Sequence, residues 1–249
     1  MATGLARGAV ARGKRIAFGD GKRILWDRHS AEIFRHNPNI AHRGLEREMG
    51  IEWIPFFKGH RLYNSAGVDR WVWNYDYKCI PGELFFDNNE RSFAKKVPDN
   101  LIIIEPNVDR RKAATQNKDW GFDRYQEIAS RLLKAGHQVG QFAFGDYRLA
   151  GVRQIPTLGF RYACVALKKA KLLIGPEGGL HHAAAAVGTP AVVLFGGFVP
   201  PEVTGYDTHT NLTGGVEACG SWKLCQHCRD ALDSISVDEV YEAAIKRVG

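Results

Sequence analysis

The segment from Leu172 to Phe195 constrains the fold of this chain more than any other stretch. It consists of an apolar run, a turn containing Gly178 and Gly179, an alanine-rich stretch and a second apolar run, LLIGPEGGLHHAAAAVGTPAVVLF. This order predicts a buried strand, a glycine turn, a helix and a second buried strand parallel to the first. In open α/β sheets ligands bind at the carboxyl ends of strands, and the amides of a helix N-terminus suit a phosphate. We therefore expect a ligand site at this turn.

Strands and helices alternate through the rest of the second half of the chain. The spacing of apolar residues and the turn signals predict strands at 101–105 and 138–144 and helices at 122–133, 162–171 and 237–248. Ser236 is the expected N-cap of the last helix, because its hydroxyl suits the unpaired first-turn amides. Alternation of this kind is typical of a parallel sheet with helices on both faces, so the predicted fold class is α/β.

The first hundred residues do not show this regular alternation of strands and helices. Short strands are predicted at 15–18 and 23–26, joined by the turn sequence GDGK, and residues 51–77 interleave aromatic with basic side chains. A break is expected near Val97 and Pro98. We therefore predict an N-terminal lobe at 1–97 and a C-terminal lobe at 98–249, with the active site in the cleft between them.

Composition narrows the class of protein. The 249 residues carry 45% hydrophobic residues, enough for one large or two small domains, and no apolar run approaches the ~20 residues of a membrane span. The N-terminus lacks the apolar core of a secretory signal, and five cysteines, an odd number, indicate a reducing compartment. A cytoplasmic protein is expected. The net charge of +7 favours an anionic partner or simply aids solubility.

The motif at the glycine turn resembles that of glycosyltransferase family 9, which contains the ADP-heptose:lipopolysaccharide heptosyltransferases. The family signature has an acidic residue, a glycine turn, a histidine, an alanine-rich helix, Gly-x-Pro and a strand ending in Phe-Gly; here it runs from Glu177 to Gly197. Lys118-Asp119-Trp120 resembles the family's Lys-x-Trp motif. The resemblance covers residues 101–248 well and weakens towards the N-terminus. It implies a GT-B-like fold, with two Rossmann-type lobes containing parallel sheets and the nucleotide-sugar donor held by the C-terminal lobe.

The resemblance implies a metal-independent glycosyltransferase that moves a heptose or hexose from a nucleoside diphosphate to a hydroxyl acceptor with inversion. The residues expected to bind the donor are Asn107, Lys118, Glu177, Gly178, Gly179, Leu180 and His182. Amides of the glycine turn would hold the diphosphate, Lys118 would neutralise it and His182 would add a hydrogen bond. Spacing alone fits a plain tight turn and a buried histidine equally well. Glu177 has two interpretations, binding of ribose or sugar hydroxyls and stabilisation of the helix that follows.

Two departures from the family pattern concern the acid groups. Glu177 stands where the heptosyltransferases usually carry aspartate. The family also begins with a strand and a Gly-Asp loop that supplies its presumed catalytic aspartate, whereas this chain begins MATGLARG, similar to the helix after that loop. We therefore expect a small N-terminal lobe without its first strand and leave the general base unassigned. The candidates are Asp20, Asp27 and Asp76.

Three cysteines near the C-terminus form a second candidate site. Cys219, Cys225 and Cys228 give the spacing C-x5-C-x2-C, and three thiols suit tetrahedral zinc. The first spacing is not that of a zinc ribbon, and buried thiols explain Cys225 and Cys228 equally well. The sequence interpretation therefore favours no metal and no cofactor besides the donor substrate.

Two rival functions fit the same residues. One is a nucleotide-sugar-binding protein without catalysis, and the other is a glycosyltransferase that modifies nucleic acid through its aromatic, basic N-terminal lobe. The expected partners are accordingly the nucleotide-sugar donor and a glycan, lipid-linked or nucleic-acid acceptor. The lack of G-x-G-x-x-G after any predicted strand argues against a nicotinamide-dependent dehydrogenase.

Overall fold

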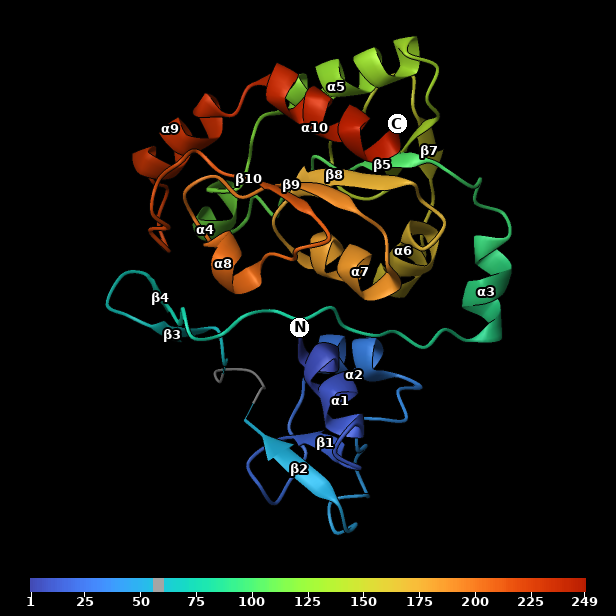
Figure 1. The fold of residues 1–249 in the computed structure, drawn as a ribbon, viewed down its shortest axis with the longest axis vertical. Coiled ribbons are helices and arrows are strands. Elements are labelled where there is room, and N and C mark those ends of the chain that lie inside the picture. The colour runs from blue at the N-terminus through green and yellow to red at the C-terminus, as the bar shows by residue number, and fades with distance from the viewer. Residues whose placement is uncertain (56–60) are drawn as a thin grey trace.

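The computed structural model describes residues 1–55 and 61–249. It has a large α/β lobe and a smaller N-terminal lobe, with an extended segment running between them (Figure 1). The large lobe is built around one sheet, whose strands are β5 (Ile102–Ile104), β6 (Val139–Phe142), β7 (Arg153–Ile155), β8 (Leu172–Pro176), β9 (Ala191–Leu194) and β10 (Thr210–Leu212).

All strand pairs of this sheet are parallel, and their spatial order is β10-β9-β8-β5-β6-β7. The helices of this lobe are α4 (Ala113–Gln116), α5 (Phe122–Lys134), α6 (Phe160–Leu167), α7 (Gly179–Val187) and α8 (Pro201–Thr204), which lie between strands, and α9 (Gln226–Ser234) and α10 (Val237–Val248), which follow β10. The predicted strand–turn–helix–strand unit is confirmed as β8, α7 and β9. The edge strands β7 and β10, which sequence patterns did not predict, are only three residues long.

Helices cover both faces of the sheet, as predicted (Figure 1). On one face α5 and α10 pack over Ile102, Ile104 and Ile174, and Trp120 lies in the same cluster. On the other face α6 and α7 pack over the alternate strand residues, among them Ile103 and Val193. This alternation of buried side chains is what a parallel sheet with two covered faces requires. The α/β fold class is therefore confirmed.

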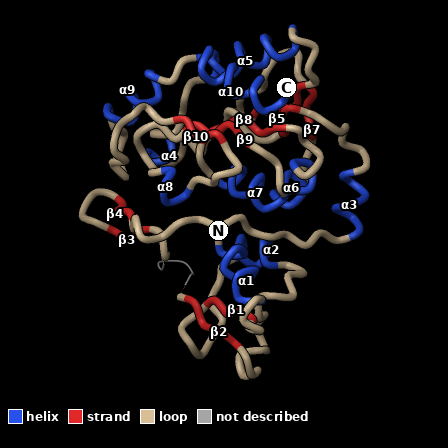
Figure 2. The backbone as a smooth tube through the Cα atoms, in the orientation of Figure 1, coloured by secondary structure: helices blue, strands red, loops and turns tan. Residues whose placement is uncertain are grey.

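The small lobe contains two helices and a two-stranded parallel sheet. Its elements are α1 (Ala2–Val10), β1 (Arg15–Phe18), α2 (Arg28–Phe34) and β2 (Ile51–Ile54). Strand β1 pairs with β2 in register Arg15 to Ile51, and the remainder of the lobe is mostly loop (Figure 2). The strand expected at 23–26 was wrong, because only Ile24 forms a bridge, to Gly19, across the turn.

Residues 61–97 pack against the large lobe. The hairpin of β3 (Asn64–Ala66) and β4 (Trp71–Trp73) contacts the loop at 219–222, where the Trp71 amide donates to the Gly220 carbonyl at 2.9 Å. Helix α3 (Asn88–Ala94) packs on α6, and an ion pair between Glu90 and Arg161 joins them. The extended chain between hairpin and α3 therefore runs along the underside of the large lobe (Figure 1). The boundary between 1–97 and 98–249 stays a prediction.

The aromatic residues of the N-terminal half are used in packing. Trp71 and Trp73 pack against the core of the large lobe, and Trp71 lies 5.4 Å from the ring of Trp222. Trp53 contacts the small core around Ala17 and Ile24. Phe56 and Phe57, which belong to the same aromatic segment, lie outside the described residues. These contacts identify Trp53, Trp71 and Trp73 as packing residues.

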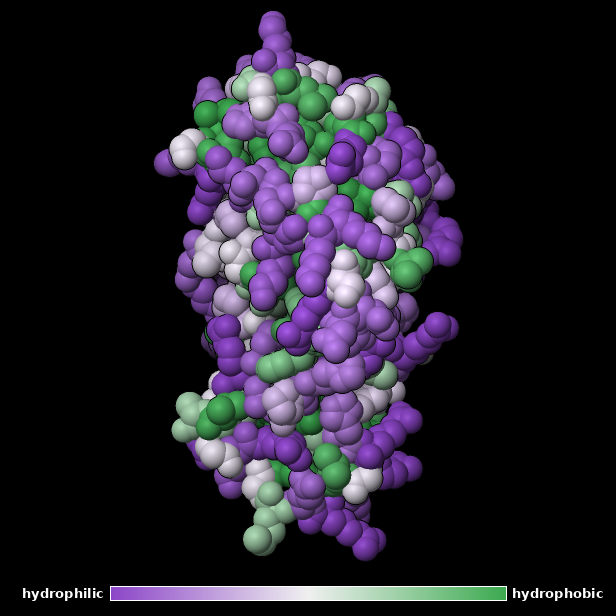
Figure 3. Space-filling view, turned by 90° about the vertical axis from the view of Figure 1, so that its right-hand side faces the viewer, coloured by the Kyte–Doolittle hydropathy of each residue, from purple (hydrophilic) through white to green (hydrophobic). Residues whose placement is uncertain are grey.

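The face shown in Figure 3 is mostly hydrophilic, with apolar side chains in small groups. Within residues 1–55 and 61–249, no helix combines the length and the apolar character needed to cross a bilayer.

Candidate functional site

A cavity of about 190 Å³ lies where the chain order of the large sheet changes direction. From β5 the chain moves to β6 and β7 on one side and then returns to β8 on the other. The loops that leave β5 and β8 therefore diverge and open a crevice at their carboxyl ends, which is the usual ligand site of such sheets. Its lining includes Glu105, Asn107, Lys118 and residues 175–180. This cavity therefore coincides with the position at which the sequence analysis expected a ligand site.

Lys118 and Glu177 form an ion pair in the wall of this cavity. The Lys118 ammonium donates to the Glu177 carboxylate, and the two side chains are only 15% and 7% exposed. Burial alone would raise the pKa of Glu177, but the charge and the hydrogen bond of Lys118, together with His181, outweigh burial and hold that pKa below its usual value. Glu177 is therefore ionised, and it fixes the position of the Lys118 ammonium beside the cavity.

The N-terminus of α7 supplies the other polar groups of the cavity wall. His181 Nδ1 accepts a hydrogen bond from the Gly178 amide at 2.9 Å, so its Nε2 carries the proton and donates to the Thr204 carbonyl at 3.0 Å. Burial lowers the pKa of His181 to about 4, so the ring is neutral. Both of its ring nitrogens have hydrogen-bond partners. The Gly178 amide, expected to face a diphosphate, is thus occupied. Gly179 and Leu180 begin the helix, where amides have no intrahelical acceptor.

His182 lies beside the same ion pair. Its Nδ1 is hydrogen-bonded to the Tyr206 hydroxyl at 2.8 Å, and its Nε2 is 3.9 Å from Glu177 Oε1. Burial lowers the pKa of His182 well below its ordinary value, so the ring is neutral near pH 7. The structure therefore brings together Lys118, Glu177 and His182, three of the residues that the sequence analysis selected.

Asn107 lines the cavity, but its side chain is turned towards the loop at 144–147. The Asn107 amide donates to Glu105 Oε1 at 2.6 Å and to the carbonyls of Phe144 and Tyr147, each at 3.2 Å. Its Oδ1 accepts from the Tyr147 amide at 3.1 Å. These bonds occupy the polar atoms of Asn107, which stabilise the rim of the cavity.

Glu105 is a cavity residue that the sequence analysis missed. It follows β5 directly and is 4% exposed, and among the described residues its Oε2 has no hydrogen-bond partner. Burial raises the pKa of Glu105 to about 7. The available signal was a carboxylate at the end of an otherwise apolar strand, a position that faces the ligand crevice in parallel sheets.

The raised pKa of Glu105 predicts that it destabilises the fold at alkaline pH. An unfolded glutamate has a pKa of about 4.3. The preference of the folded state for protonated Glu105 therefore contributes fully to stability below that pH, and this contribution is lost as the pH rises through 7. We expect a loss of about 2–3 kcal/mol between pH 5 and pH 9, measurable by urea unfolding, that is absent in Glu105→Gln. The exposed Glu242→Gln serves as the control. Equal pH dependence in all three proteins would contradict the assignment.

Glu177, His181 and His182 are close enough to hold a metal ion, but their polar atoms already have other partners. Ligand atoms of Glu177, His181 and His182 lie within 4.8 Å of one another. However, Lys118 already neutralises the carboxylate, and both ring nitrogens of His181 are engaged. A cation here would have to displace the ammonium of Lys118.

A second cavity, of about 320 Å³, lies between the two lobes next to the N-terminus of α7. Its lining includes Asp27 and Arg61 from the N-terminal side and Gly179 and His182 from α7. Asp27 caps α2, where its carboxylate accepts from the Ser30 amide at 2.8 Å, and this bond lowers the pKa of Asp27.

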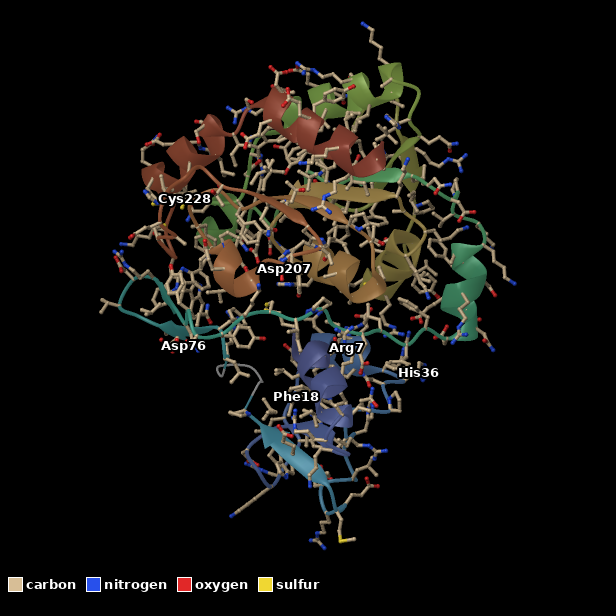
Figure 4. All side chains as sticks on the ribbon, viewed as in Figure 1. Arg7, Phe18, His36, Asp76, Asp207 and Cys228 are labelled. Carbon is tan, nitrogen blue, oxygen red and sulfur yellow. The ribbon has the colours of Figure 1, made fainter. Side chains whose placement is uncertain are left out.

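The other two carboxylates proposed as the base lie elsewhere. Asp20 pairs with Arg23 at 3.0 Å inside its turn, and Asp76 follows the β3–β4 hairpin (Figure 4). Of the three candidates, only Asp27 lines the cavity between the lobes.

Comparisons with known proteins agree with the sequence resemblance. The model of glycosyltransferase family 9 (heptosyltransferase) matches residues 17–235. A search of curated proteins finds no match.

Three solved structures are similar to this chain. ADP-heptose lps heptosyltransferase II of E. coli shares 20% identity and a TM-score of 0.48, covering 71% of this chain and 54% of that one. The glycosyl transferase family 9 protein of Veillonella parvula shares 19% identity with a TM-score of 0.49, covering 67% of this chain and 53% of that one. The iron-containing dodecameric glycosyltransferase TibC of enterotoxigenic E. coli shares 17% identity with a TM-score of 0.49, covering 67% of this chain and 48% of that one. The chain thus spans about half the length of these structures.

Proposed function

This chain belongs to glycosyltransferase family 9, and from that premise we propose that it transfers a heptose or hexose from a nucleoside diphosphate to a hydroxyl acceptor. The proposed reaction inverts the anomeric centre and uses no metal ion. The observation that carries the proposal is the cavity at the ends of β5 and β8, where a helix N-terminus and a buried lysine meet. An inverting transfer needs stabilisation of the departing diphosphate and a base for the acceptor hydroxyl.

The donor half of the proposal rests on the wall of that cavity. The first-turn amides of Gly179 and Leu180 and the positive end of the α7 dipole favour a diphosphate there. Lys118 adds a fixed positive charge, and the neutral His182 offers a hydrogen bond. Glu177 keeps two roles in the proposal, since it orients Lys118 and lies where ribose or sugar hydroxyls would reach it. These groups stabilise leaving-group charge in the transition state.

Gly178 provides a test of where the diphosphate lies. Its backbone is extended, with φ 162°, and a Cβ built there would meet nothing within 4 Å, so side chains fit without strain. Aspartate is a favourable N-cap, and Gly178→Asp is expected to keep or slightly raise the melting temperature. Its charge would repel the diphosphate and weaken nucleotide binding by at least about tenfold, or 1.4 kcal/mol. The neutral cap Gly178→Ser is the control. Equal affinities of the wild type and the aspartate variant would place the diphosphate elsewhere.

The acceptor half of the proposal assigns the general base to Asp27. This carboxylate lines the cavity between the lobes, together with Gly179 and His182 of the proposed donor site. Asn is as good an N-cap as Asp, so Asp27→Asn should fold normally while losing the base. We expect transfer or hydrolysis of the sugar nucleotide to fall by about 10²–10⁴-fold, with nucleotide affinity unchanged. Asp76→Asn is the matched control, because Asp76 lines neither the cavity between the lobes nor the candidate donor cavity.

The same assay separates the rival functions. Nucleotide binding with no turnover in the wild type would identify a sugar-nucleotide-binding protein. Full activity of Asp27→Asn would reject Asp27 as the base. A nucleic-acid acceptor predicts DNA binding that weakens steeply with salt. The packed state of Trp71 and Trp73 gives that alternative no additional support, so a glycan or lipid-linked acceptor is preferred.

A further inference from the structure

Three cysteine side chains that are separated in sequence converge beside the large sheet. Cys219 lies in the loop after β10, Cys225 directly precedes α9, and Cys228 is in the first turn of α9 (Figure 4). The Sγ atom of Cys219 is 3.7 Å from that of Cys225 and 3.2 Å from that of Cys228. All three sulfur atoms lie within 4.8 Å of one another, and Cys228 is fully buried.

These separations match a shared metal better than a covalent bond. Zinc–sulfur bonds of about 2.3 Å at tetrahedral angles hold two sulfurs about 3.8 Å apart. A disulfide would need about 2.05 Å. Cys225 and Cys228 also lie at the N-terminus of a nine-residue helix, whose amides stabilise thiolates. The Ser221 amide donates to Cys219 Sγ at 3.5 Å, a contact typical of the outer shell of thiolate sites.

We propose that Cys219, Cys225 and Cys228 bind one thiophilic divalent metal ion in a tetrahedral site whose fourth ligand is water or a small molecule. Softness and geometry select zinc or iron over magnesium and calcium. His227 is adjacent in sequence, but its Nε2 is engaged with the Glu217 carbonyl at 2.8 Å. Within the described residues, the ligand cluster therefore consists of three thiols.

The metal would stabilise one wall of the candidate donor site. The Asn117 side chain donates to the Lys223 carbonyl at 2.8 Å and accepts from the Cys225 amide at 3.0 Å. Asn117 directly precedes Lys118. The loop that carries Cys219 also contacts the hairpin, where the Trp71 amide donates to the Gly220 carbonyl. Trp71 in turn lines a small cavity with Lys118, Glu177 and His182. The ion would thus be structural, tying together the chain segments that position Lys118.

The test is the metal content of the purified full chain, measured by elemental mass spectrometry. We expect about one equivalent of zinc or iron per chain, lost in Cys219→Ser, a change in a half-exposed loop that should leave the fold intact. Cys164→Ala, at a buried cysteine outside the cluster, should keep the metal. After chelation, added Co²⁺ should give thiolate charge-transfer absorption in the wild type and bind at least about tenfold more weakly to Cys219→Ser.

Either of two results would overturn the proposal. The first is a reduced wild-type protein that carries no metal and shows no thiolate absorption with Co²⁺. The second is a disulfide between two of the three cysteines in protein purified under reducing conditions. Both measurements are made without nucleotide, so they succeed or fail independently of the proposed transferase function.

Discussion

Replacement of Lys118 by alanine is expected to lower the free energy of unfolding by about 3–5 kcal/mol. The reason is that Glu177, only 7% exposed, would remain as a buried carboxylate without its counter-charge. The cost is therefore that of the unpaired charge rather than that of the lost contact. Chemical denaturation at pH 7 measures it directly. The double variant Lys118→Met with Glu177→Gln removes both charges and should recover most of the loss.

Nucleotide titration of the same proteins separates stability from binding. The single and the double variant both lack the Lys118 ammonium, so both should bind nucleoside diphosphate about 1–3 kcal/mol more weakly than the wild type. Stability recovers in the double variant, but affinity does not. A Lys118→Ala protein as stable as the wild type would show that the ion pair is not formed in solution.

Glu90 is the second position where a single change should have a large effect. Its side chain is fully buried and accepts hydrogen bonds from Arg161 at 2.6 and 2.9 Å and from Arg35 at 2.5 Å. Arg161 is itself 1% exposed. Glu90→Gln would leave that guanidinium without its counter-charge, so we expect a loss of about 3–5 kcal/mol in urea unfolding. The exposed pair of Arg15 and Glu48 is the control, and Glu48→Gln should cost less than about 1 kcal/mol.

The Glu90 network also predicts sensitivity to acid. Burial opposes ionisation of Glu90, but hydrogen bonds from Arg161 and the Asp87 amide outweigh it and hold the pKa at about 2. A folded pKa below the unfolded value of about 4.3 stabilises the protein above that pH, and this contribution disappears as the pH falls towards 2. Glu90→Gln should therefore show a shallower loss of stability between pH 5 and pH 2. An unchanged acid transition would contradict the network.

Local patterns predicted the elements that position the candidate site. The helix α7 ends at Gly188, which adopts φ +81°, a conformation that favours glycine, and Ser236 caps α10 by accepting from the Glu239 amide at 3.1 Å. Lys118, Glu177 and His182 came together as the family resemblance implied. Each of these features depends on a few neighbouring residues or on a motif with a known place in the fold.

Features that depend on distant contacts were not predictable in this way. The orientation of Asn107 depends on the loop at 144–147, about forty positions along the chain, and the raised pKa of Glu105 depends on its burial in the folded lobe. The short edge strands β7 and β10 carry too few residues for a periodic pattern and are ordered by their neighbours. The convergence of the cysteines depends likewise on how the loop before α9 packs, because their spacing alone left zinc binding and buried thiols equally open.

We propose that the cavity at the ends of β5 and β8 holds the diphosphate of a sugar nucleotide. Calorimetric titration of the purified chain with ADP, UDP and GDP, without added metal, tests it most directly. We expect saturable binding of one nucleotide with a dissociation constant in the micromolar range, about −8 kcal/mol, which Gly178→Asp weakens and Gly178→Ser largely retains. Absence of binding to all three, by a folded wild-type protein, would contradict it.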